Sequence, residues 1–228
     1  MTTLGHPGAR RKTCARRPPE RPVPRCAHHP QSAMTNPSTA DALPCSVALV
    51  GLMGAGKSAI GTRLAHHWGV AFTDTDTEVE RAAGMSIADI FELHGEPAFR
   101  DCERRVIARL LDGPPQVLAT GGGAFVQDAT RALIRERAVS VWLKADLDTL
   151  YRRTHKRGHR PLLQTEDPRA KLERLAAERD PLYAQADLTV PTDDRPLDAT
   201  VAAVAQAVEA HFAARGTPPT PRTGATES

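Results

Sequence analysis

A glycine-rich segment that ends in lysine and serine is the part of this sequence that most directly predicts chemistry. Residues 51–58 read Gly-Leu-Met-Gly-Ala-Gly-Lys-Ser and fit G-x-x-x-x-G-K-[S/T] at every fixed position. Glycines let the backbone curl so that successive N–H groups face a phosphate anion. Lys57 is then placed to reach the β- and γ-phosphates of ATP, and the hydroxyl of Ser58 to ligate Mg²⁺. The pattern predicts nucleoside triphosphate binding, with an ordinary glycine turn as the alternative.

Two aspartates follow the second predicted strand. Asp74 and Asp76 are two residues apart, and in extended chain their side chains would point the same way. One carboxylate can then hold the water shell of the metal while the other orients an acceptor hydroxyl for in-line attack. The alternative is that one of them caps the next helix.

A strand-and-helix alternation supplies the scaffold for these residues. Apolar runs at 46–50, 116–120, 138–143 and 188–190, with a further strand near 71–72, predict buried strands. We expect helices over 57–67, 77–112 with breaks near Gly84 and Gly95, 167–186 and 197–213. The alternation predicts an α/β fold of the P-loop kinase type, with three α/β/α layers around a central five-stranded parallel sheet.

Composition limits the chain to one substantial core. It has 228 residues, of which 40% are hydrophobic and 25% charged. The net charge is +3 overall and +6 in residues 1–33, so the remainder carries −3 and a general nucleic-acid surface is not expected there. The four cysteines show no spacing typical of a zinc site or disulfide framework.

A glycine triplet and three arginines complete the set of candidate residues. Gly121, Gly122 and Gly123 follow a predicted strand and permit a close approach to a ligand or merely to a neighbouring helix. For Arg100, Arg160 and Arg179 a surface role would be the default interpretation if each stood alone. Their sequence neighbours change that interpretation.

Six segments, taken in order, resemble the shikimate kinase family over about residues 46–212. They are Gly-Leu-Met-Gly-Ala-Gly-Lys-Ser at 51–58, Asp-Thr-Asp at 74–76, Gly-Glu-Pro-Ala-Phe-Arg at 95–100, Gly-Gly-Gly at 121–123, Arg-Pro-Leu-Leu at 160–163 and Arg-Asp-Pro-Leu-Tyr at 179–183. The resemblance implies transfer of the γ-phosphoryl group of ATP to the 3-hydroxyl of shikimate, with Mg²⁺ as cofactor.

The same resemblance implies roles for individual residues. The positions that match shikimate-binding residues are Asp76, Arg100, Gly122 and Arg179. Those that match ATP-binding residues are Gly54, Ala55, Gly56, Lys57, Ser58, Ala59, Arg153, Arg160 and Arg195. Lys57, Asp76 and Arg160 would be catalytic, Ser58 would ligate the metal, and Asp74 would contact it through water. Arg100 and Arg179 suit a substrate carboxylate because the planar guanidinium can bind it bidentately.

One position departs from the family pattern. The family usually has threonine after the metal-ligating serine, whereas this chain has Ala59, which offers phosphate only its backbone N–H. We therefore expect a slightly different affinity for ATP and the same activity. A basic lid is expected over residues 154–166, closing when substrates bind.

Two other functions compete with this interpretation. A gluconate kinase would share the phosphate loop and fold, but is not expected to carry the segments at 95–100, 121–123 and 179–183 together. A kinase-like regulator that binds nucleic acid through a basic arm is the second alternative, although no helix-turn-helix pattern precedes the domain.

The flanking segments are expected to lie outside the folded domain. Residues 1–43 form a Pro/Arg-rich extension predicted to be disordered, residues 44–213 the kinase domain, and residues 214–228 a disordered tail. Residues 1–33 are expected to be dispensable for catalysis. No apolar run reaches the ~20 residues of a membrane span, so we expect a cytoplasmic protein without membrane or nucleic-acid partners. We expect a monomer.

Overall fold

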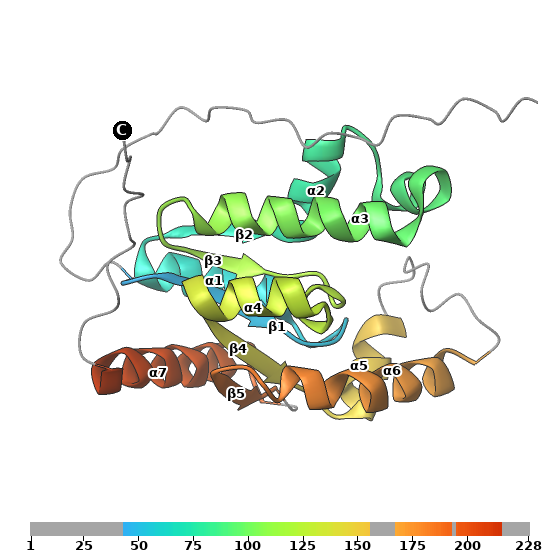
Figure 1. Ribbon diagram of the computed structural model, residues 1–228. Coiled ribbons are helices and arrows are strands. Elements are labelled where there is room, and N and C mark those ends of the chain that lie inside the picture. The colour runs from blue at the N-terminus through green and yellow to red at the C-terminus, as the bar shows by residue number, and fades with distance from the viewer. Residues whose placement is uncertain (1–42, 156–166, 193–194, 216–228) are drawn as a thin grey trace, which may run out of the picture.

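A computed structural model describes residues 43–155, 167–192 and 195–215 (Figure 1). The sheet is entirely parallel, with strand order β2-β3-β1-β4-β5. Its strands are β1 (Ser46–Val50), β2 (Ala71–Asp74), β3 (Gln116–Ala119), β4 (Ala138–Lys144) and β5 (Leu188–Pro191). The helices are α1 (Lys57–Trp68), α2 (Thr75–Ala83), α3 (Ile87–Leu111), α4 (Asp128–Arg137), α5 (Leu147–His155), α6 (Pro168–Tyr183) and α7 (Leu197–Arg215), with a 3-10 turn η1 (Ala124–Val126). The predicted five-stranded parallel α/β fold is confirmed.

Several sequence-based expectations fall outside these residues. They concern residues 1–42 of the basic extension, residues 156–166 of the lid and residues 216–228 of the C-terminal tail. Among the described residues, no helix has the length and apolar character that crossing a bilayer requires.

The strand order determines which helices cover each face of the sheet. The chain moves from β1 outward to β2 through α1, and then returns across the sheet to β3, β4 and β5. Because parallel crossovers are right-handed, reversing the direction of travel puts the connecting helices on the opposite face. Accordingly α1 packs against β3, β2 and α7, whereas α4 packs against β4 and α3. The sheet is therefore enclosed between two helical layers, as Figure 1 shows.

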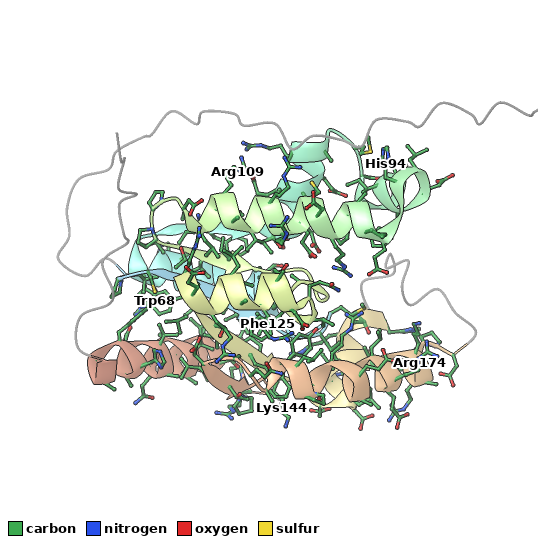
Figure 2. The ribbon with its side chains drawn as sticks, viewed as in Figure 1. Trp68, His94, Arg109, Phe125, Lys144 and Arg174 are labelled. Carbon is green, nitrogen blue, oxygen red and sulfur yellow. The ribbon has the colours of Figure 1, made fainter. Side chains whose placement is uncertain are left out.

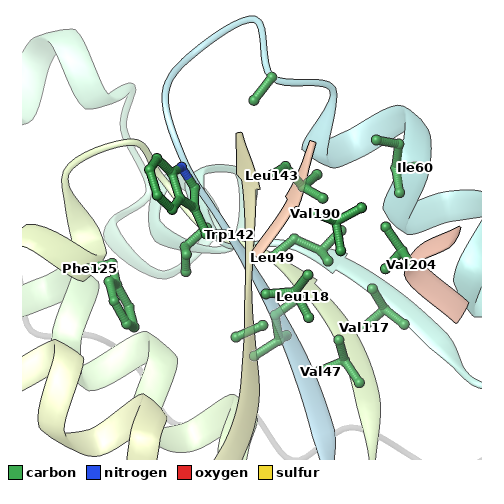
Figure 3. Packing of buried hydrophobic residues seen from close by; sticks show 14 of the residues in the cluster. Val47, Leu49, Ile60, Val117, Leu118, Phe125, Trp142, Leu143, Val190 and Val204 are labelled. Atoms are coloured by element: carbon green, nitrogen blue, oxygen red, sulfur yellow. The ribbon is translucent and has the colours of Figure 1, made fainter. Parts of the chain in front are cut away.

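The main apolar core lies on both faces of the central strands. Every residue of β1 and β3 is buried. In Figure 3, Phe125 and Trp142 lie on one side of the strands, and Ile60 of α1 and Val204 of α7 lie on the other. Burial on both sides explains why these strands read as continuous apolar runs rather than as alternating patterns.

A second, smaller core joins α2 to the long helix α3. It consists of buried Val79, Ile90, Phe99, Cys102 and Val106. An ion pair reinforces the contact, since Arg109 of α3, labelled in Figure 2, donates to Glu78 of α2 at 2.8 Å. The α2–α3 unit thus has packing of its own beside the sheet.

Glycines interrupt the helical segments as predicted. Gly84 ends α2 with φ 69°, and Gly95 has φ 79° and ψ 171° within α3, a kink followed by Pro97. The final helix is longer than the expected 197–213, ending at Arg215, because Ala214 and Arg215 are strong helix formers.

Close packing of α1 on the sheet yields a test of the fold. A Cβ on Gly61 would lie 2.6 Å from Cε2 of Phe72 and 3.2 Å from Cδ1 of Leu49. Gly61→Ala should lower the free energy of unfolding by about 1–3 kcal/mol, because overpacking outweighs the gain in helix propensity. Urea unfolding of both proteins measures the difference.

Thr62→Ala, on the exposed side of the same helix, is the control and should change the free energy of unfolding by less than about 0.5 kcal/mol. A Gly61→Ala protein as stable as the wild type would contradict the packing described here.

Candidate active site

The phosphate loop connects β1 to α1 at the carboxyl edge of the sheet. Gly54 and Gly56 adopt φ of 87° and 97°, a backbone region that residues with a Cβ rarely enter. Gly56 directly precedes Lys57, the first residue of α1. The loop therefore leads into a helix N-terminus, which favours anions through its unpaired N–H groups and dipole.

Lys57 is folded back over the start of the loop. Its Nζ donates to the carbonyl oxygens of Gly51 at 2.7 Å and Leu52 at 3.0 Å. These bonds hold a positive charge at the mouth of the loop, where a phosphate chain would lie.

Ser58 and Asp74 are neighbours, as a shared metal site requires. The Ser58 hydroxyl donates to Oδ2 of Asp74 at 2.9 Å, linking α1 to the end of β2. Oδ1 of the same carboxylate accepts from the backbone N–H of Asp76 at 3.1 Å and caps α2. Asp74 therefore caps α2, the alternative role, and also lies beside Ser58; its contact with a metal ion stays a prediction.

The expected extended geometry of the two aspartates is wrong. Helix α2 begins at Thr75, so Asp76 lies in its first turn rather than in a continued strand. The reason is the cap itself, because the Asp74 carboxylate satisfies an N–H that a helix start would otherwise leave unpaired. The two carboxylates thus diverge, with Asp74 toward Ser58 and Asp76 toward the glycine triplet.

The glycine triplet lies beside the phosphate loop. Its first N–H, that of Gly121, donates to Oγ1 of Thr75 at 3.1 Å. A Cβ on Gly121 would lie 2.5 Å from Oδ1 of Asp76 and 2.9 Å from Oε1 of Glu103, so any larger residue would displace a carboxylate. A Cβ on Gly122 would be 3.8 Å from the backbone N of Met53 in the loop. The triplet is thus in contact with both the loop and the acidic groups.

Arg100 reaches the triplet from α3. Its guanidinium lies against Gly123, where an added Cβ would be 2.8 Å from Cζ. Glu96 accepts from it at 3.1 Å and Glu103 at 2.8 Å, which fixes the side chain in place. The Phe99 ring lies under the same guanidinium, 4.9 Å from Cζ to the ring centroid.

Glu103 is a site residue that sequence reasoning missed. Its side chain is 1% exposed, and Oε1 has no hydrogen-bond partner among the described residues. Burial raises the pKa of this carboxyl group, an effect that Arg100 opposes and the nearby Asp76 reinforces. A signal was available, because a glutamate three residues after an arginine lies on the same face of a helix.

Arg179 reaches the triplet from α6, on the other side. Its Nη1 donates to the carbonyl of Gly122 at 3.0 Å, and the buried Tyr183 hydroxyl donates to the same oxygen. Two arginines far apart in sequence therefore contact neighbouring glycines. Tyr183 belongs to the motif at 179–183, but only the structure gives it a contact with the triplet.

Three predicted site residues remain, Arg153, Arg160 and Arg195, together with the expected start of the lid. Thr154, the expected first residue of the lid, is instead a buried residue of α5, and a Cβ on Gly54 would lie 2.9 Å from its Cγ2. Arg153 directly precedes Thr154, the residue at which α5 contacts the phosphate loop. Arg195 is exposed before α7, and its adenine contact stays a prediction. Arg160 lies outside the described residues.

A comparison with protein families gives one match across most of this domain. The family model described as shikimate kinase matches residues 53–209. The shikimate kinase of Nitrobacter winogradskyi is 61% identical over 153 residues, which are 67% of this chain and 72% of that protein. The shikimate kinase of Bradyrhizobium diazoefficiens is 56% identical over 167 residues, covering 73% of this chain and 81% of its own length.

Solved structures agree with the sequence matches. The shikimate kinase from Acinetobacter baumannii in complex with shikimate superposes with a TM-score of 0.70 and 38% identity, over 74% of this chain and 94% of that one. The Aquifex aeolicus shikimate kinase gives a TM-score of 0.63 at 28% identity, over 75% of this chain and 99% of that one.

Burial of Glu103 predicts a pH dependence of stability. A carboxyl group whose pKa is raised by folding binds its proton more tightly in the native state. Its contribution to the free energy of unfolding is therefore present below the ordinary pKa of 4.5 and is lost as the pH rises through the raised pKa. Urea unfolding across this range should therefore show wild-type stability falling relative to Glu103→Gln as pH increases.

Asp101→Asn, on the exposed side of the same helix, should show no such relative fall, because its side chain is 51% exposed. If the wild type gained stability relative to Glu103→Gln on going from pH 4.5 upward, the ion pair with Arg100 rather than burial would dominate.

Proposed function

This chain belongs to the shikimate kinase family, and we propose that it transfers the γ-phosphoryl group of ATP to the 3-hydroxyl of shikimate, giving shikimate 3-phosphate and ADP. Family membership favours shikimate over gluconate as the acceptor. The regulator with a nucleic-acid-binding arm is disfavoured, because such a protein would have no need for the arginines and the phosphate loop to converge.

One observation carries this proposal. Arg100 of α3 and Arg179 of α6 converge on the glycine triplet, which lies against the phosphate loop at Met53. A small molecule with a carboxylate would be clamped by the two guanidinium groups while its hydroxyl faced the phosphates of ATP. Shikimate has a carboxylate for the two arginines and ring hydroxyls that can face the phosphates.

The phosphate loop supplies the second half of the reaction. We assign the phosphates of ATP to the loop residues Gly54, Ala55, Gly56, Lys57, Ser58 and Ala59. Lys57 would leave its two carbonyl partners to meet the β- and γ-phosphates, and Asp76 would accept a hydrogen bond from the acceptor hydroxyl. Positioning and charge stabilisation then account for most of the catalysis.

The residues at the metal position fit Mg²⁺. The Ser58 hydroxyl and the Asp74 carboxylate offer two oxygens 2.9 Å apart beside the loop, and oxygen is the ligand type that Mg²⁺ prefers. Mg²⁺ keeps several waters and relies on nucleotide phosphates, so few protein ligands are needed. Ser58 would ligate the ion and Asp74 would hold one of its waters, while the bound ion would neutralise charge on the phosphates.

Further assignments follow from the family resemblance. We assign Arg160 to the transferring phosphate, Arg153 and Arg195 to the adenine side, and a closing lid to the segment that contains Arg160. The monomeric state and the cytoplasmic location stay predictions. Light scattering coupled to size-exclusion chromatography measures the first.

The activity itself is tested with purified protein, ATP and Mg²⁺. Shikimate should be phosphorylated, and gluconate offered at the same concentration should not; mass spectrometry of a single turnover identifies the product. Lys57→Ala, prepared in parallel, should lose most of kcat while still binding shikimate, because its charge matters most as the γ-phosphoryl group departs. Absence of phosphate transfer to shikimate by protein that binds ATP would contradict the proposed function.

The carboxylate clamp makes a separate prediction. Arg100→Lys or Arg179→Lys keeps the charge but loses the planar fork, so shikimate binding should weaken by about 1.5–3 kcal/mol. The affinity for ATP should change little. Calorimetric titration with each ligand measures both affinities.

Each variant has a matched control on the same helix. Arg104→Lys on α3 and Arg174→Lys on α6 replace arginines that are 44% and 66% exposed, and should leave shikimate binding unchanged. Equal weakening for ATP and shikimate in the clamp variants would mean that Arg100 and Arg179 support the fold or the nucleotide instead.

A further inference from the structure

The carbonyl oxygen of Gly122 receives two hydrogen bonds from α6. Arg179 donates through Nη1 at 3.0 Å, and the Tyr183 hydroxyl donates to the same oxygen. A carbonyl has two lone pairs, so both of its acceptor positions are used. The two donors are one helical turn apart, which puts them on the same face of α6.

These bonds fix the direction of a peptide group in the triplet. In a trans peptide the N–H points opposite to the C=O, so holding the Gly122 carbonyl toward α6 turns the N–H of Gly123 away from it. In the same way, Ala124 N–H bonds to the Gly121 carbonyl at 3.1 Å and sets the direction of the Gly122 N–H.

The two N–H groups oriented in this way, those of Gly122 and Gly123, are the unused backbone donors of the triplet among the described residues. Gly121 N–H is bonded to Thr75, whereas within the described part of the chain neither Gly122 N–H nor Gly123 N–H donates to any acceptor. Both glycines are partly exposed beside the phosphate loop. A pair of oriented backbone donors next to two arginines is suited to an anionic group such as a carboxylate.

Tyr183 is itself held rigidly. Its side chain is 0% exposed, and burial raises the pKa of the hydroxyl to about 12, so it remains a proton donor at neutral pH. Its ring packs against Trp142, with centroids 6.0 Å apart. Trp142 in turn packs near the start of the phosphate loop, where a Cβ on Gly51 would lie 3.3 Å from its Cδ1.

From these contacts we propose that Tyr183 is a positioning residue for the carboxylate of the acceptor substrate. Its hydroxyl and Nη1 of Arg179 together hold the Gly122 carbonyl, which aligns the N–H groups of Gly122 and Gly123. Tyr183 touches no reacting atom, and its role rests on the proposed acceptor being shikimate.

Tyr183→Phe tests this role because it removes the hydroxyl and keeps the ring. The KM and the dissociation constant for shikimate should rise about three- to tenfold, the loss expected for one neutral hydrogen bond. The KM for ATP should stay within about twofold and kcat within about threefold, because the phosphate loop and Asp76 are untouched. A purely structural role would lower Tm without this difference between the two substrates.

Ser140→Ala is the matched control. Ser140 is fully buried in β4, and its hydroxyl donates to the Asp187 carboxylate at 2.6 Å and accepts from the Asp187 N–H at 2.9 Å. The variant therefore also loses hydrogen bonds of a buried hydroxyl, but none that contacts the triplet. Its KM for shikimate should equal that of the wild type. An equal rise in both variants, or no rise in Tyr183→Phe while the wild type turns over shikimate, would overturn the inference and leave the proposed function intact.

A second measurement avoids any change in folding. The chain contains two tyrosines, Tyr151 and Tyr183, so the full-length protein labelled with 3-fluorotyrosine gives two ¹⁹F resonances that Tyr151→Phe assigns. Shikimate added without ATP should shift the Tyr183 resonance. A Tyr183 resonance that saturating shikimate leaves in place would overturn the positioning role, and a wild-type chain that binds no shikimate would overturn both this inference and the proposed acceptor.

Discussion

Three consecutive glycines at the carboxyl end of β3 leave a space that four other elements fill. Asp76 of α2 and Glu103 of α3 lie against Gly121, and Arg100 of α3 lies against Gly123. Arg179 of α6 and the phosphate loop approach Gly122. Any side chain in the triplet would occupy the position of a carboxylate or guanidinium. These three positions must lack side chains so that charged groups from separate helices can meet at one edge of the sheet.

This convergence places charge where solvent is scarce. Glu103 has almost no exposed surface, and its pairing with Arg100 compensates for part of the cost of burying it. The same pairing, together with Glu96, restricts the guanidinium to one orientation. An arginine held in this way loses little side-chain entropy when it binds a carboxylate, so the cost of ordering is met on folding rather than on binding.

The two apolar cores give the two halves of the site different mechanical support. The phosphate loop is attached to the main core through β1 and α1, whereas Arg100 and Asp76 belong to the α2–α3 unit with its own small core. The two parts share α3, because its Ile107 and Leu111 belong to the main core, and hydrogen bonds from Gly121 to Thr75 and from Ser58 to Asp74 also join them. A phosphate loop on the main core and an acceptor wall with additional packing of its own are compatible with binding two substrates side by side.

Local pattern was sufficient for much of the fold and for the identity of the site. The strand–loop–helix at 46–68, the helix breaks at Gly84 and Gly95, and the parallel sheet follow from apolar runs, glycine positions and the alternation of elements. The phosphate loop and the segments at 95–100, 121–123 and 179–183 identified the family, because each is contiguous and carries its own spacing.

Tertiary structure decided which of these residues meet, and in what geometry. The bond from Tyr183 to Gly122 spans 61 positions and that from Gly121 to Thr75 spans 46. Asp76 was misjudged because the start of α2 depends on a cap whose side chain also contacts Ser58, 16 positions away. The spacing of Glu103 from Arg100 signals a shared helix face, but its burial beside Gly121 depends on another element and was missed. Periodicity reports which face of an element is apolar, but contacts between polar groups on different elements exist only once the sheet and its helical layers have packed.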